Sequence, residues 1–226
     1  MKYAQTLKGK FISRPNRFIA YVEIGGEEKV CHVKNTGRCK ELLIPGATVV
    51  LEKSDKPERK TEYDLISVYK GDKLINMDSQ APNKVFGEWA AESGFFGEAP
   101  FIKPECRYGA SRFDFYVEAE GRRIFVEVKG VTLERDGIIL FPDAPTERGV
   151  KHINELADAV KNGYEAYVFF ICQMKDCRFF TPNRETHPQF ADALKTAAEK
   201  GVQVRCVNCD LSEDTLTIDG FVEVRL

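Results

Sequence analysis

Residues 111–129 read Ser-Arg-Phe-Asp-Phe-Tyr-Val-Glu-Ala-Glu-Gly-Arg-Arg-Ile-Phe-Val-Glu-Val-Lys. The stretch predicts two strands joined by a turn at Gly121. Side chains alternate between the faces of a strand, so Glu127 and Lys129 project on the same side. Asp114 lies on the first strand, before the glutamate and lysine of the second. This order of carboxylate, carboxylate and lysine is the pattern of metal-dependent nucleases.

These residue types suit metal-assisted phosphodiester chemistry. Asp114 and Glu127 can hold Mg²⁺ or Mn²⁺, hard cations that otherwise bind water and phosphate oxygens. Lys129 can orient an attacking water or neutralise charge that develops on the phosphoryl group. Glu105 and Glu88 are candidate auxiliary ligands, because carboxylates that converge repel one another unless a cation is present. The alternative is that Glu-Val-Lys is a solvated strand face.

Charge is distributed unevenly along the 226 residues. The formal net charge of −2 gives no overall attraction to nucleic acid. Residues 1–80 contain 15 Lys and Arg against 11 Asp and Glu, whereas residues 81–226 contain 18 against 24. We therefore expect the amino-terminal part to contact phosphates and the acidic remainder to suit a cation. An ordinary variation of surface charge is the alternative.

The first 80 residues favour short strands separated by turns. Six strands are predicted, over residues 7–12, 18–24, 29–33, 48–53, 63–69 and 73–77. Pro15-Asn16, Gly25-Gly26 and Pro45-Gly46 supply turn chemistry between them. Many short strands at close spacing predict a small barrel, and the count fits a five-stranded barrel of the oligonucleotide-binding (OB) type.

The pattern changes near Ala81-Pro82, and the rest of the chain predicts a layered α/β domain. Helices are expected over residues 83–93, 148–162 and 188–200, and strands over 101–108, 112–118, 122–129, 165–172 and 202–207. Asp219-Gly220 predicts the tight turn of a terminal hairpin. The expected organisation is a mixed α/β chain. Its parts are an OB-like, nucleic-acid-binding barrel at residues 1–80 and a nuclease-like domain at residues 81–226.

Two further stretches carry donors suited to phosphate. Residues 32–40 form a polar, glycine-turned loop after a predicted strand. Residues 141–152 hold a proline-rich turn, Thr146 as a helix cap, and cations at the helix start, where free N–H groups attract anions. The alternatives are a plain turn and a capped helix with surface charges. The candidate nucleic-acid contacts are Arg14, Arg17, His32, Lys34, Asn35, Thr36, Arg38, Arg112, Arg148, Lys151 and His152.

Seven cysteines, an odd number, favour reduced thiols over a disulfide framework. Cys172 and Cys177, with Cys206 and Cys209, have spacings that occur in zinc sites. Cys172 and Cys206 fall in apolar strands, so buried free thiols are the simpler interpretation, and metal binding by the four stays open. No apolar run approaches the roughly 20 residues that cross a bilayer, and the amino terminus lacks an apolar signal core. We expect a cytoplasmic protein without membrane contact.

Several ordered motifs resemble the bacterial and archaeal sugar fermentation stimulation protein family. They are Arg17-Phe-Ile-Ala, Asn35-Thr-Gly, Tyr108-Gly-Ala-Ser-Arg-Phe-Asp, Val126-Glu-Val-Lys and Phe141-Pro-Asp-Ala-x-Thr-x-Arg-Gly-x-Lys-His. The resemblance implies a DNA-binding protein with an amino-terminal OB-type barrel and a carboxy-terminal domain of PD-(D/E)xK nuclease type. It also implies that Asp114, Glu127 and Lys129 occupy the family's catalytic positions. Nothing in these residues indicates a sugar-binding site.

The leading hypothesis is a protein that binds DNA, or RNA, and hydrolyses phosphodiesters with Mg²⁺ or Mn²⁺. Asp114, Glu127 and Glu105 would bind the metal, and Asp114, Glu127 and Lys129 would form the catalytic set. The first alternative is a non-enzymatic DNA-binding transcriptional regulator of sugar metabolism that retains the nuclease fold. A small-molecule phosphodiesterase or nucleotide-binding module is the second. A homodimer is left open.

Overall fold

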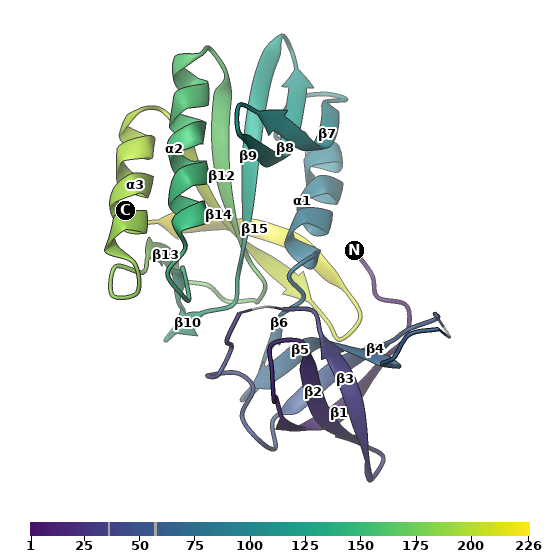
Figure 1. Cartoon of the computed structure of the whole chain (residues 1–226). Helices are drawn as coiled ribbons and strands as arrows, with labels where there is room; N and C mark the ends of the chain where they lie inside the picture. Colours follow the sequence, from purple (N-terminus) through teal and green to yellow (C-terminus); the bar gives the residue numbers. More distant parts are fainter. Residues whose placement is uncertain (36, 57) are drawn as a thin grey trace.

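The structure of the chain is a computed structural model that describes residues 1–35, 37–56 and 58–226. Two β-sheets organise the molecule, one built before residue 80 and one after it (Figure 1). We place the proposed domain division between residues 80 and 81, after the last strand of the first sheet and before the first helix. In the described ranges, no helix combines the length and the apolar character needed to cross a membrane.

Six short strands build the first sheet: β1 (Thr6–Ser13), β2 (Ile19–Ile24), β3 (Glu27–Val33), β4 (Thr48–Lys53), β5 (Tyr63–Lys70) and β6 (Lys73–Asn76). β3 pairs in parallel with β5 as well as antiparallel with β2, so five strands close in the order β1-β2-β3-β5-β4. β6 pairs with β5 outside this ring. Val22, Leu51 and Leu65 are fully buried within the barrel strands. The predicted mixed α/β fold with an amino-terminal OB-type barrel is confirmed.

The second part of the chain alternates helices and strands. Its elements are α1 (Ala81–Glu92), β7 (Phe101–Tyr108), β8 (Ser111–Ala119), β9 (Arg122–Val131), β10 (Glu134–Arg135), β11 (Ile138–Phe141), α2 (Glu147–Lys161), β12 (Glu165–Cys172), β13 (Phe179–Pro182), α3 (Pro188–Glu199), β14 (Gln203–Leu211) and β15 (Leu216–Val224). The strand order is β10-β11-β13-β15-β14-β12-β9-β8-β7. β12 lies at the centre, parallel to both β9 and β14.

Helices cover both faces of this sheet, α1 on one and α2 with α3 on the other (Figure 1). Alternate side chains of β12 show the division. Phe169 packs on Phe86 of α1, with ring centroids 5.0 Å apart. Phe170 belongs to the other apolar cluster, with Leu156 of α2 and Leu194 of α3. Burial on both faces explains why the sequence of this strand is apolar almost throughout.

The end of the chain differs from the prediction. Asp219-Gly220 lies inside β15, where Gly220 pairs with Asn208 beside a shift of register. The hairpin turn falls earlier, at residues 212–215, where the Ser212 N–H donates to the Thr215 carbonyl at 3.1 Å. The Asp-Gly pair therefore stands at an irregular point of a strand rather than at a turn. β10, β11 and β13 were not predicted, because they have only two to four residues each.

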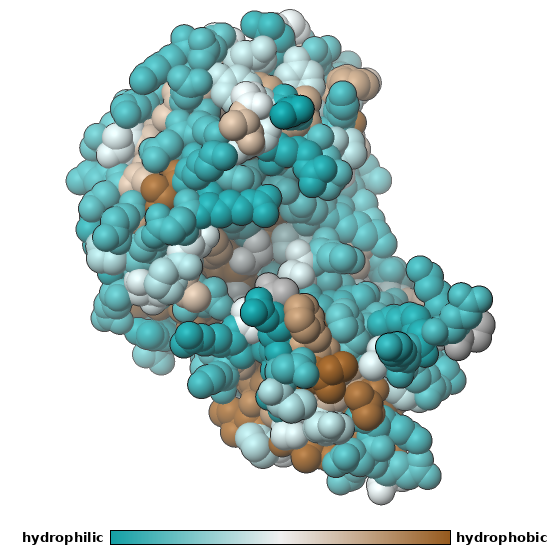
Figure 2. Space-filling model, viewed as in Figure 1, coloured by the Kyte–Doolittle hydropathy of each residue, from teal (hydrophilic) through white to brown (hydrophobic). Residues whose placement is uncertain are grey.

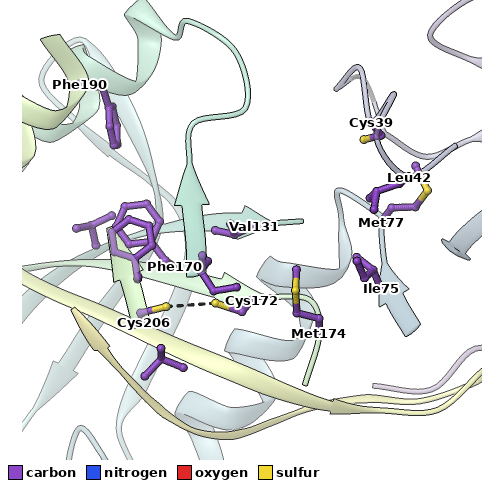
Figure 3. Close-up of a cluster of buried hydrophobic side chains, with 14 of the residues drawn as sticks. Cys39, Leu42, Ile75, Met77, Val131, Phe170, Cys172, Met174, Phe190 and Cys206 are labelled. Atoms are coloured by element: carbon purple, nitrogen blue, oxygen red, sulfur yellow. Dashed lines mark hydrogen bonds between the residues drawn. The ribbon is translucent and has the colours of Figure 1, made fainter. Parts of the chain in front are cut away.

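The two parts of the chain share one apolar core. Figure 3 shows Ile75 and Met77, from the end of the barrel, beside Met174 and Cys172 after and within β12. All four side chains are fully buried. Because these side chains are fully buried, the contact between the two parts resembles a domain interior more than a hinge.

A buried amide joins the same two regions. The Gln173 Nε2 group donates to Asn76 Oδ1 at 2.7 Å and to the Asp78 carbonyl at 3.0 Å. The Gln173 carbonyl accepts from the Asn76 N–H at 2.9 Å. The amide is closely packed against Gly130, where no larger residue would fit. An added Cβ at this position would lie 2.6 Å from Gln173 Oε1 and 2.6 Å from Pro82 Cγ. The end of β9, the start of α1 and the barrel are thereby held in one arrangement.

We predict that Gln173→Leu destabilises the whole chain by about 1–3 kcal/mol, because two buried acceptors each lose their shorter hydrogen bond and keep only a longer one. Urea unfolding followed by circular dichroism measures the change. Gln189→Leu, at an exposed position of α3, is the matched control and should change stability little. Equal effects of the two substitutions would contradict the assigned role of Gln173.

Candidate active site

Asp114 reaches across from β8 to the neighbouring strand. The β8–β9 register runs from Ala119, opposite Arg122, to Phe115, opposite Val126. Beyond that pair, a side chain replaces the backbone acceptor: Asp114 Oδ2 accepts a hydrogen bond from the Val128 N–H at 2.8 Å. Its other oxygen, Oδ1, accepts from Asn83 Nδ2 of α1 at 2.9 Å. The aspartate is thus fixed against the backbone between Glu127 and Lys129.

Glu127 is a buried carboxylate with one paired and one free oxygen. Its residue exposure is 2 %. Oε1 lies 2.5 Å from Lys129 Nζ and 2.5 Å from His152 Nδ1. Since an ionised carboxylate only accepts, the imidazole nitrogen is the donor. Oε2 is buried and has no hydrogen-bond partner in the part of the chain that the structure describes.

The environment shifts the pKa values of the two carboxyl groups in opposite directions. Burial by itself would raise the pKa of Glu127, but the hydrogen bond from His152 and the Lys129 cation bring it below its usual value. Burial raises the pKa of Asp114, and the Glu127 charge raises it further. Asp114 therefore feels the charge of Glu127, as expected for a pair that would share a cation.

The auxiliary carboxylates have other neighbours. Glu105 lies between two residues of β7 that pair with Phe113 and Phe115, so it stands across from Asp114. Its exposed side chain pairs with Arg112 at 3.4 Å. Glu88 instead lies 2.6 Å from the amino-terminal ammonium group. Among residues 1–35, 37–56 and 58–226, no three His, Cys, Asp or Glu side chains are arranged as ligands of one metal ion. The metal role of Glu105 stays a prediction.

His152 has a setting that the sequence did not indicate. Its residue exposure is 5 %, so the side chain faces the protein interior rather than a nucleic-acid backbone. Arg148 Nε donates to His152 Nε2 at 3.4 Å, while Nδ1 contacts Glu127. Thr146 fixes the start of α2, because its Oγ1 accepts from the Gly149 N–H at 3.0 Å. The four-residue spacing of Arg148 and His152 places them on one helix face, the sequence signal for this pair.

Two grooves lie close to the start of α2, and neither is lined by Asp114, Glu127 or Lys129. One, of about 370 Å³, is lined by Gly130 and Thr132 at the end of β9 and by Thr146 before α2. The other, of about 670 Å³, lies on the barrel. Gly37 and Ala144 line both grooves. Figure 2 shows the corresponding hollow between the upper and lower parts of the molecule.

Several predicted contacts of the barrel have structural partners instead. The Arg14 guanidinium donates to four backbone carbonyls, at distances of 2.6–2.9 Å, those of Arg17, Asn35, Gly37 and Arg38. Arg14 therefore holds the backbone of Asn35, Gly37 and Arg38 and is not free to bind phosphate. Asn35 donates to the Met77 carbonyl at 2.8 Å and accepts from the Gly37 N–H at 2.7 Å.

The remaining candidates divide by exposure. Lys34 lies within 3.5 Å of Glu52, Asp64 and Asp78, and His32 lies 2.9 Å from Asp64. These two belong to an internal ion-pair network, which leaves little charge for a ligand. Thr36 lies outside the described residues. Five cations are exposed: Arg17, Arg38, Arg112, Arg148 and Lys151.

The cysteine cluster is apolar. Cys172 Sγ lies 3.2 Å from Cys206 Sγ (Figure 3), and both residues are buried. Burial raises the pKa values of Cys172 and Cys209 far above the ordinary thiol range. A protonated thiol is a poor metal ligand and a poor nucleophile, so these side chains act as core residues.

Family models match most of the chain. The model described as "Sugar fermentation stimulation protein RE domain" matches residues 80–215, and "SfsA N-terminal OB domain" matches residues 12–77. A "Sugar fermentation stimulation protein homolog" of Clostridium beijerinckii is 60 % identical over 226 residues, 100 % of both chains. A homolog of Desulfitobacterium hafniense is 61 % identical over 100 % of this chain and 99 % of the relative.

A solved structure gives the same result at the level of the fold. It is described as "The structure of Pyrococcus Furiosus SfsA in complex with Ca2+". Its TM-score is 0.90 with 30 % identity, and the match covers 100 % of this chain and 98 % of that one.

We predict that Asp114→Asn stabilises the metal-free protein near neutral pH. The raised pKa means that the ionised carboxylate destabilises the fold above that pKa. The penalty disappears as the pH falls below the ordinary value of 3.8, so the gain from the substitution should vanish in acid. Thermal unfolding in EDTA at several pH values measures it. Asp192→Asn, exposed on α3, should give no such pH-dependent gain.

Proposed function

The chain belongs to the sugar fermentation stimulation protein family, and from this membership and the site geometry we propose that it binds DNA and hydrolyses phosphodiester bonds with a divalent cation. One observation carries the proposal: a buried Glu127 carboxylate has one oxygen bound by Lys129 and His152 and the other left without a partner. A buried, unpaired carboxylate oxygen is costly in a protein without a ligand.

The residues present fit a hard divalent cation. The unpartnered Glu127 Oε2 and the Asp114 carboxylate are oxygen donors of the kind that Mg²⁺ and Mn²⁺ prefer. The Pyrococcus relative was solved with Ca²⁺, which takes the same kind of ligand. Asp114 and Glu127 would hold the ion, with Glu105 as a further candidate. When bound, the cation would polarise the phosphoryl oxygens and lower the pKa of a bound water.

The protein's own residues have separate roles in this proposal. His152, held by Arg148, donates to Glu127 Oε1 and so fixes which carboxylate oxygen stays free. His152 is then a positioning residue. Lys129, with 18 % of its side chain exposed, would stabilise negative charge that develops on the phosphoryl group. Asn83 and the Val128 N–H fix Asp114 in the same way.

Nucleic-acid binding is the other half of the proposal. The barrel groove is lined by the exposed side chains of Arg17, Arg38 and Lys40. Through Gly37 and Ala144 it meets the groove at the end of β9, one residue beyond Lys129. A basic groove that leads toward the strand carrying Glu127 and Lys129 suits a phosphodiester backbone. This arrangement favours a polynucleotide over a small phosphodiester.

We predict that Lys129→Ala keeps metal binding but lowers cleavage about 10²–10³-fold, the usual cost of removing one charge-stabilising group. Glu127→Gln should lose both, because a neutral amide is a poor ligand for Mg²⁺. Calorimetric titration with Mn²⁺ and cleavage of labelled DNA measure the two quantities. His152→Ala should weaken Mn²⁺ binding, whereas His152→Asn keeps an N–H donor and should retain more of it.

Lys195→Ala and Glu199→Gln, both exposed on α3, are the matched controls and should behave as the parent protein does. Clear DNA binding by the parent without cleavage under Mg²⁺, Mn²⁺ or Ca²⁺ would instead favour the alternative of a non-enzymatic DNA-binding regulator.

We also predict that DNA affinity falls steeply with salt, and that reversing Arg17 and Arg38 to glutamate flattens this dependence. Each lost phosphate contact should lower the log–log slope by about one, because fewer counterions are released. Fluorescence anisotropy at several salt concentrations, in EDTA, gives the slope. Lys195→Glu, at an exposed position of α3, is the control. An unchanged slope in the double variant would place DNA elsewhere.

A further inference from the structure

The barrel groove combines a basic rim with an apolar floor. Phe11 and Leu43 line it and are buried, while Arg17, Arg38 and Lys40 line it and are exposed. In the portion of the chain that the structure describes, no Asp or Glu lines this groove. The cations of the rim suit phosphates, whereas the apolar floor suits an apolar surface of the ligand. A ligand that fits this groove therefore has both.

Large exposed apolar side chains adjoin residues that line the groove. Phe18, next to Arg17, is 50 % exposed, and Ile44, between Leu43 and Pro45, is 57 % exposed; Ile12 itself lines the groove and is 36 % exposed. Figure 2 shows apolar atoms gathered on the barrel part of the visible face. The Arg17 guanidinium lies 5.7 Å from the centre of the Phe18 ring. A cation beside an exposed aromatic ring forms a platform on which a flat π-system can stack.

We propose that this groove binds an unpaired segment of nucleic acid, with a base stacked on Phe18 and phosphates bound by Arg17, Arg38 and Lys40. The inference rests on the proposed function and names the form of its substrate. A duplex keeps its base faces stacked inside and presents phosphates and sugars outward, so it offers nothing to an exposed phenylalanine. An unpaired strand offers base faces and phosphates together, which suits a positive groove with an aromatic platform.

The path to the carboxylate site supports the same form. The strand would pass from the barrel groove to the smaller groove at the end of β9, where Gly37 and Ala144 line both. The crossing is tight, since an added Cβ at Gly37 would lie 3.0 Å from Asp143 Oδ2. The bonds of Gln173, which lines the smaller groove, and the shared apolar core hold the two parts together. A passage that cannot open widely admits one strand more readily than two.

The test compares labelled oligo-deoxythymidine with a duplex of the same length, by anisotropy in EDTA at one salt concentration. The parent should bind the single strand about tenfold more tightly than the duplex. Phe18→Ala should lower single-strand affinity about tenfold and leave duplex affinity unchanged, and Phe18→Trp should restore the single-strand affinity. Phe101→Ala, at a 57 % exposed position of β7, is the matched control and should change neither affinity.

Each other outcome contradicts a particular statement. Equal affinity for the two forms, or single-strand binding by Phe18→Ala that equals that of the parent, would overturn this inference and leave the proposed function standing. Binding of neither form by the parent would overturn the nucleic-acid half of the proposed function, and this inference with it. A loss in Phe101→Ala equal to that in Phe18→Ala would show that the platform is not at Phe18.

Discussion

A carboxylate buried at the centre of β9 imposes the main constraint on this molecule. An ionised group out of water is tolerated only where partners replace its hydration. Glu127 obtains them from Lys129 on its own strand and from His152 on α2. The position of α2 therefore matters to the carboxylate as well as to the core, and the Thr146 cap that begins the helix is tied to the same requirement. The burial of the Glu127 carboxylate thus constrains both the packing of α2 on the second sheet and the chemistry of the site.

The sequence predicted the elements whose patterns are local. Alternation and turn residues located the six strands of the first sheet, and the apolar run of 165–172 located the central strand of the second. The carboxylate–lysine pattern indicated Asp114 and Glu127, which the structure places within electrostatic reach of each other. Such features follow from residues close together in the chain, where a periodicity of two or 3.6 can be read directly.

Features that depend on contacts between distant segments could not be predicted in this way. Arg14 looked like a phosphate contact because its charge is visible in the sequence, whereas three of its four carbonyl partners lie more than 20 residues away in the chain. His152 is similar, since its burial depends on β9 lying beneath α2. β10, β11 and β13 are short strands at one end of the sheet, with too few residues for a pattern. The Asp219-Gly220 turn was wrong because β14 and β15 pair through an irregular register there.

The apolar core that runs from the barrel to β12 has a further consequence for how the chain folds. Family models divide the sequence near residue 80, but the contact surface formed by Ile75, Met77 and Met174 does not follow that division. A barrel made alone would present Ile75 and Met77 to water and would tend to aggregate. The sequence family divides the chain into two domains, whereas the shared core makes the whole chain one cooperative unfolding unit. Heat should therefore unfold the chain in a single transition. A chimera that takes its barrel from one relative and its second domain from another would need matching side chains at the positions of Ile75, Met77 and Met174.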